Sequence, residues 1–139
     1  MLKFKTIVYV LSNKALKKEK NLEIKEAVIG YQYGEKIKSC LIIATKLLDM
    51  LGALSGEKML GAQEILITYL NALLMEIGIA VNSSKSEPLK EAKAKVQEAI
   101  GDFQLGEYTR AGRSLSQAIS KATTCCQRAM IKLKDEGLI

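Results

Sequence analysis

The sequence predicts an all-α protein, an antiparallel four-helix bundle with an additional N-terminal segment. Three observations indicate this fold: apolar residues recur at steps of three and four along four long stretches, turn residues separate these stretches, and the only proline is Pro88. At 139 residues the chain has the length of one domain. We expect residues 21–139 to form the bundle and residues 1–20 to form a basic segment.

The N-terminal segment admits more than one structure. Residues 3–12 are rich in β-branched side chains and fit a strand. A helix over the same region would place four apolar residues on one face, namely Phe4, Val8, Leu11 and Ala15. A helix or a docked arm fits a helical chain better, because a lone strand needs another subunit to pair with. The apolar run over residues 6–11 is shorter than a signal-peptide core of roughly 7 to 15 residues.

The first helix is predicted over residues 21–54, where two adjacent lines of apolar residues cover nearly half of the circumference. We therefore expect this helix to contact two neighbours. One line holds Tyr33, Ile37, Leu41, Ala44, Leu48 and Leu51, and the other holds Cys40, Ile43, Leu47, Met50 and Leu54. Glycines and a serine at 52–56 then supply a turn.

The second helix, residues 57–81, is apolar on nearly all sides. A helix of this kind in a small protein needs a central position or a subunit interface. We expect both, so that it is the most buried helix and joins a homo-oligomer. Two of its residues, Glu64 and Glu76, would each cost roughly 2 to 3 kcal/mol inside a bilayer even on a permissive scale, which argues against a membrane contact. The predicted interface residues are Leu66, Tyr69, Leu70, Leu73 and Ile77.

The third helix, residues 87–105, has the most regular pattern. Ser86 is placed to cap its first turn, Pro88 lies within that turn, and Gly106 follows its end. Its inward residues are Leu89, Ala92, Val96, Ala99 and Phe103.

The stretch GDFQLGEYTRAGRSLSQAISKA resembles the turn and second helix of a tetratricopeptide repeat. Gly106, Tyr108, Ala111 and Ala118 occupy the matching positions. The stretch occurs once, and a solenoid needs about three or more copies to bury its faces. The resemblance therefore implies a tight antiparallel helix hairpin and no family.

The fourth helix, residues 107–136, divides into a wet face and a dry face. The wet face holds Arg110, Ser114, Gln117, Lys121, Thr124, Arg128 and Lys132, with Arg113 beside it. The dry face holds Leu115, Ile119, Ala122, Cys126, Met130 and Leu133, and Cys125 lies on its flank with three alanines. Both cysteines are expected to pack as small hydrophobic residues, because mid-helix thiols without a neighbouring base are rarely reactive.

Charge is distributed unevenly along the chain, whose net charge is +6. Residues 1–25 carry +5, residues 26–109 carry −3 and residues 110–139 carry +4. Since no carboxylate lies between Glu107 and Asp135, the wet face of the last helix is a candidate binding surface for an anionic partner. Its five candidate residues are Arg110, Arg113, Lys121, Arg128 and Lys132. The same charges also suit pairing with acidic residues of the middle segment.

The absence of histidine excludes histidine-dependent catalysis and histidine-ligated metal sites within this chain. The three cysteines match no metal or redox spacing, and an odd, low count suits a reducing cytoplasm. No glycine-rich phosphate loop is present. We therefore expect no catalytic, metal or cofactor site.

The predicted function is a non-catalytic helical interaction protein. It would be a small subunit or adaptor that self-associates through apolar helices and presents basic surfaces to an anionic partner, such as another protein. The alternative is a nucleic-acid-binding accessory subunit that uses the basic face of the last helix with weak sequence selectivity, because no aromatic residue accompanies the charge there.

Overall fold

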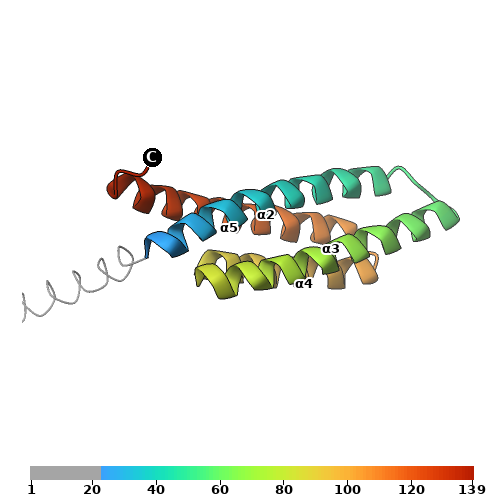
Figure 1. Ribbon diagram of the computed structural model, residues 1–139. Helices are drawn as coiled ribbons and strands as arrows, with labels where there is room; N and C mark the ends of the chain where they lie inside the picture. Colours follow the sequence, from blue (N-terminus) through green and yellow to red (C-terminus); the bar gives the residue numbers. More distant parts are fainter. Residues whose placement is uncertain (1–22) are drawn as a thin grey trace, which may run out of the picture.

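The computed structural model describes residues 23–139, and four long helices make up most of this range (Figure 1). They are α2 (Ile24–Leu51), α3 (Gly56–Ser84), α4 (Glu87–Gln104) and α5 (Tyr108–Asp135). Each helix packs against its neighbour in sequence, and α5 also packs against α2, which closes the bundle. The predicted antiparallel four-helix bundle is thereby confirmed. Predictions for residues 1–20 fall outside the described residues.

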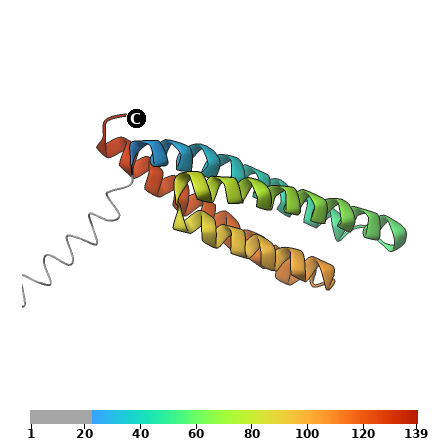
Figure 2. The same ribbon diagram turned by 60° about the horizontal axis from the view of Figure 1, so that its bottom comes forward.

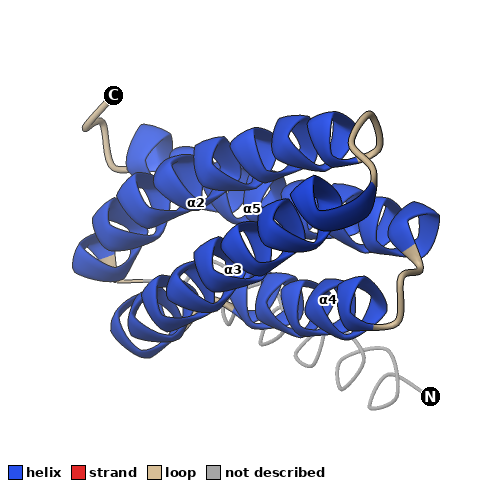
Figure 3. Cartoon of the chain, turned by 90° about the vertical axis from the view of Figure 1, so that its right-hand side faces the viewer, coloured by secondary structure: helices blue, strands red, loops and turns tan. Residues whose placement is uncertain are grey.

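Short connections join the helices, as Figure 3 shows. The start of α4 is fixed as predicted, because the Ser86 hydroxyl accepts a hydrogen bond from the Leu89 backbone N–H at 3.2 Å and Pro88 occupies the first turn. Gly106, which follows the C-cap residue Leu105 of α4, adopts a φ of +74°, a left-handed conformation that glycine reaches without steric penalty. The predicted tight hairpin of α4 and α5 is formed at this point, with the rings of Phe103 and Tyr108 6.0 Å apart.

Helices α2 and α5 approach each other closely because small residues meet at their contact. Gly30 and Gly34 of α2 are buried against Cys125 and Cys126 of α5. A Cβ placed on Gly34 would lie only 2.7 Å from the Cys126 sulfur, so a larger residue would force the thiol or the helices to shift. The sequence pattern did not single out these two glycines.

The core differs from the prediction in which helix it buries most. Helix α5 has nine buried residues whereas α3 has six, so α3 is not the most buried helix. The reason is length: α3 with 29 residues is about 44 Å long, while α4 with 18 residues is about 27 Å long. Figure 2 shows the α2–α3 hairpin extending beyond the α4–α5 turn. The first turns of α3 consequently have no α4 residues beside them.

Candidate interaction surfaces and an interhelical cleft

Three of the five predicted partner-binding cations form ion pairs within the described chain. The Lys121 ammonium lies 2.6 Å from the Glu91 carboxylate of α4, and the Arg110 Nε lies 3.9 Å from the Asp102 carboxylate. Lys132 pairs with Glu136 at 2.7 Å on its own helix. The partners were hidden from the sequence pattern because two of them come from α4, which packs beside α5. The middle segment therefore neutralises part of the wet face.

The Lys121–Glu91 pair also changes a protonation equilibrium. The hydrogen bond and charge of Lys121 lower the pKa of the Glu91 carboxyl below its usual value. Arg128 contributes to the same lowering as a smaller effect. Since both Lys121 and Glu91 are substantially exposed, this pair aligns α4 with α5 and contributes little stability.

Arg113 and Arg128 are exposed, and neither forms an ion pair with another residue in the range 23–139. They are the two candidate cations whose charge the described bundle leaves open to a partner. They lie on α5 15 positions apart, which corresponds to about 22 Å along the helix axis. The predicted continuous basic face is thus reduced to two separated arginines among partly neutralised neighbours.

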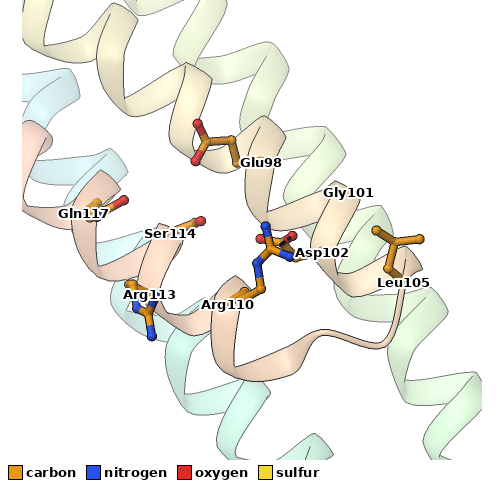
Figure 4. A pocket seen from close by; sticks show the side chains of 8 residues that line it. All are labelled: Glu98, Gly101, Asp102, Leu105, Arg110, Arg113, Ser114 and Gln117. Carbon is orange, nitrogen blue, oxygen red and sulfur yellow. Dashed lines mark ion pairs between the residues drawn. The ribbon is translucent and has the colours of Figure 1, made fainter.

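A cleft of about 390 Å³ lies between the end of α4 and the start of α5 (Figure 4). The Arg110 guanidinium extends over Asp102, and the Ser114 hydroxyl points into the cleft. The Arg113 guanidinium is directed away from α4. Eight residues line the cleft, namely Glu98, Gly101, Asp102, Leu105, Arg110, Arg113, Ser114 and Gln117.

Ser114 corrects the predicted division of α5 into two faces. It was assigned to the wet face, yet only 7% of its surface is exposed. On the dry face, Met130 is 40% exposed while Cys125 is buried as deeply as Cys126. The buried face is therefore rotated toward the predicted flank, because α5 must contact both α2 and α4.

Four of the five predicted interface residues of α3 are covered within one chain. Leu66, Leu70, Leu73 and Ile77 are at most 5% exposed within one chain. Tyr69 is partly buried, and its hydroxyl donates a hydrogen bond to the Cys40 carbonyl of α2 at 2.9 Å. For the four buried residues the burial contradicts the prediction, because periodicity identifies an apolar face without saying which neighbour covers it. For Tyr69 an interface role stays a prediction.

A different set of apolar side chains on α3 is exposed. Ile65 is 72% exposed, Met75 is 74% exposed and Ile79 is 51% exposed. These residues share one face of α3 with exposed Thr68 and Ala72, because the five follow one another at steps of three and four. We call the set Ile65, Thr68, Ala72, Met75 and Ile79 the outer stripe of α3.

The cysteines are placed for packing. The Cys125 thiol donates a hydrogen bond to the Gly30 carbonyl at 3.4 Å, and burial raises its pKa. Burial and the nearby Glu35 raise the pKa of the Cys126 thiol to about 12. Both thiols are thus protonated at neutral pH, which removes the thiolate that nucleophilic chemistry requires. Within the described range, no group of three possible metal ligands converges.

No protein-family model matches the chain, and no curated protein or solved structure shows significant similarity to it. The class that the fold defines is therefore an all-α four-helix bundle. In the part of the chain that the structure describes, α3 is long and apolar enough to cross a membrane by length and composition alone.

Proposed function

We propose that the protein is a non-catalytic interaction protein, a small subunit or adaptor that self-associates through the outer stripe of α3 and offers basic residues to an anionic partner. The observation that carries the proposal is the outer stripe itself. It exposes three large apolar side chains to water along one face of a helix. None of the three belongs to the hydrophobic core of the bundle. Apolar surface arranged in this way is typical of protein contacts.

The stripe suits a second copy of the same helix. In an antiparallel pair with a two-fold axis beside Ala72, Ile79 of one chain faces Ile65 of the other, and the small alanine lets the helices approach closely. The charged residue of α3 nearest Ala72 in sequence is Glu76, which already pairs with Lys36 of α2 at 3.4 Å. Self-association would therefore bring no unpaired like charges together at its centre.

A bilayer is a poorer environment for α3. Insertion would separate the helix from α2 and α4 and would break the packing of its six buried residues. It would also bring exposed Glu64 into lipid, at a cost of roughly 2 to 3 kcal/mol even on a permissive scale. We therefore propose a cytoplasmic protein without a membrane contact, which also suits the three free cysteines.

Sedimentation equilibrium tests this proposal. We expect the wild-type chain to form a dimer or larger assembly, and the double variant Ile65→Lys with Met75→Lys to be a folded monomer, because charges on the stripe must lose their hydration in the complex. Gln32→Lys with Gln97→Lys adds the same charge at exposed sites on α2 and α4 and should leave assembly unchanged. A monomeric wild type at the highest soluble concentration contradicts self-association. Flotation with lipid vesicles, lost in the stripe variant, contradicts the choice of a protein partner.

For the anionic partner, the observation that favours a contact on α5 is the pair of exposed arginines, Arg113 and Arg128, without ion pairs among residues 23–139. An acidic protein surface can meet two such cations. A nucleic-acid partner stays the alternative function, since two phosphate contacts alone give weak binding that carries no sequence information.

A further inference from the structure

The facing ends of α4 and α5 carry charges opposite to those that their helix dipoles favour. The last two turns of α4 hold Glu98 and Asp102 and no cation follows in its final turn, although a helix C-terminus favours cations. The first two turns of α5 hold Arg110 and Arg113, although a helix N-terminus favours anions, and the only acid at this end is the N-cap residue Glu107. Negative potential on the α4 side thus faces positive potential on the α5 side across the cleft.

The ion pair between Arg110 and Asp102 neutralises the charges on the two sides of the cleft only in part. Arg110 Nε lies 3.9 Å from Asp102 Oδ1, beyond hydrogen-bond distance. The Arg110 side chain is 66% exposed, so the outer N–H groups of its guanidinium stay open to a carboxylate. Glu98 accepts a bond from Lys95 at 3.3 Å and remains 56% exposed at the cleft rim. Each wall therefore keeps a charged group with unused bonding capacity.

Ser114 is an independent indication of a ligand. It is more than nine-tenths buried and points into the cleft (Figure 4), yet its hydroxyl has no hydrogen-bond partner among residues 23–139. No fully buried side-chain oxygen or nitrogen in that range lacks a partner, so the Ser114 oxygen must be accessible from the cleft. A hydroxyl at such a position can donate to a carboxylate or accept from an ammonium.

Gly101 keeps the α4 wall open. A Cβ added there would meet no atom within 4 Å, and the residue lines the cleft. The volume of about 390 Å³ falls within the range of small-ligand sites. The space between the two charged walls is therefore large enough for a small organic ion.

We propose that this cleft binds a small zwitterion of the amino-acid type. Its carboxylate would accept hydrogen bonds from Arg110 and Ser114 on the α5 wall, and its ammonium would lie toward Glu98 and Asp102 on the α4 wall. A simple anion would meet the two carboxylates, and a simple cation would meet the arginine, so neither satisfies both walls. The inference is independent of self-association through α3.

The test is titration of the full-length protein, followed by amide shifts in nuclear magnetic resonance spectra. The probes are glycine, 4-aminobutyrate and 6-aminohexanoate, with acetate and methylammonium as half-ligands. We expect at least one zwitterion to give saturable shifts confined to the α4–α5 hairpin. The half-ligands should bind at least about tenfold more weakly, because each lacks one charged hydrogen-bonding group. The length of the zwitterion that binds most tightly then reports the distance between the two charged walls.

Variants separate the proposal from its competitors. Arg110→Gln should weaken binding about tenfold and Ser114→Ala about fivefold, in line with charged and neutral hydrogen bonds. Gly101→Met should block the cleft while Gly101→Ala, which adds one methyl group to open space, should bind as the parent does. The α3 variant Ile65→Lys with Met75→Lys should also bind normally, so failure of self-association would leave this result intact.

Three outcomes would overturn the proposal. The first is the absence of saturable shifts with all three zwitterions in a protein that melts cooperatively. The second is binding of acetate as tight as that of the zwitterions and strengthened by Glu98→Gln, which would define a plain anion site. The third is shifts that survive Gly101→Met, which would place the ligand elsewhere.

Discussion

Gly34 of α2 is buried against Cys125 and Cys126 of α5, and a side chain there would meet the Cys126 sulfur. We predict that Gly34→Ala destabilises the fold. The added carbon would lie 2.7 Å from the Cys126 sulfur, and overpacking of this kind costs about 1 to 3 kcal/mol, more than the ~1 kcal/mol that alanine gains in helix propensity. Urea denaturation followed by circular dichroism measures the change in unfolding free energy.

Gly30→Ala is the matched control for this prediction. A carbon on Gly30 would meet its nearest atoms at 3.7 to 3.9 Å, which is ordinary contact, so the variant should be neutral or up to about 1 kcal/mol more stable. In a Cys126→Ala background, Gly34→Ala should cost less, because the sulfur is gone. Equal stability of the Gly30 and Gly34 variants would show that the two helices can separate without loss.

Single residues were predictable where the interaction is local. The Ser86 cap was predicted because its partner is three residues away in the chain. Ser114 was assigned to water, and its burial depends on α4, whose position relative to α5 no local pattern specifies. The same limit hid the close approach of Gly34 to Cys126, since the partner lies on a distant helix.

At the scale of helices, the opposing charges of α4 and α5 lead to a second prediction. Exchanging the pair, with Asp102→Arg and Arg110→Asp in one chain, should stabilise the bundle. Each charge would then lie at the helix end that favours it, at about 0.3 to 1 kcal/mol per site, while the two side chains still carry opposite charges. Thermal unfolding at low salt measures the gain, which should shrink at high salt.

The single variants are the controls for the exchange. Asp102→Arg alone sets two cations near each other, and Arg110→Asp alone sets two carboxylates near each other, so each should be less stable than the exchanged pair. An exchanged protein that melts below the parent would mean that the dipoles contribute nothing at this hairpin. The charged cleft would then need no compensating ligand.

The positions of the helices along the chain followed from the sequence, whereas the faces that each helix buries against its neighbours did not. All four helices begin and end within about three residues of the predicted limits, because turns and periodicity are local signals. The apolar residues on nearly all sides of α3 predicted a central helix. Its actual exposure arises from the shorter α4 beside it and from an outer stripe that the bundle leaves uncovered.

For the molecule as a whole, the location of the net charge changes the expectation for an anionic partner. Residues 1–22 hold six lysines and one glutamate, so they carry five of the six net positive charges. The described bundle carries the remaining one. The sequence placed a basic region at each end, but ion pairs with α4 and within α5 neutralise much of the second region.

This distribution leads to a prediction about salt. If the full chain binds an oligonucleotide, replacing Lys14, Lys17, Lys18 and Lys20 with glutamine should reduce the slope of log affinity against log salt more than Arg113→Gln with Arg128→Gln does. Each phosphate contact contributes about 0.9 to that slope on duplex DNA, so the expected reductions are at most about 3.6 and about 1.8. Fluorescence anisotropy at several salt concentrations measures both. A larger reduction from the two arginines would make α5 the main contact, because the arginines would then contact more phosphates than the lysines do. No binding at low salt would leave an acidic protein as the anionic partner.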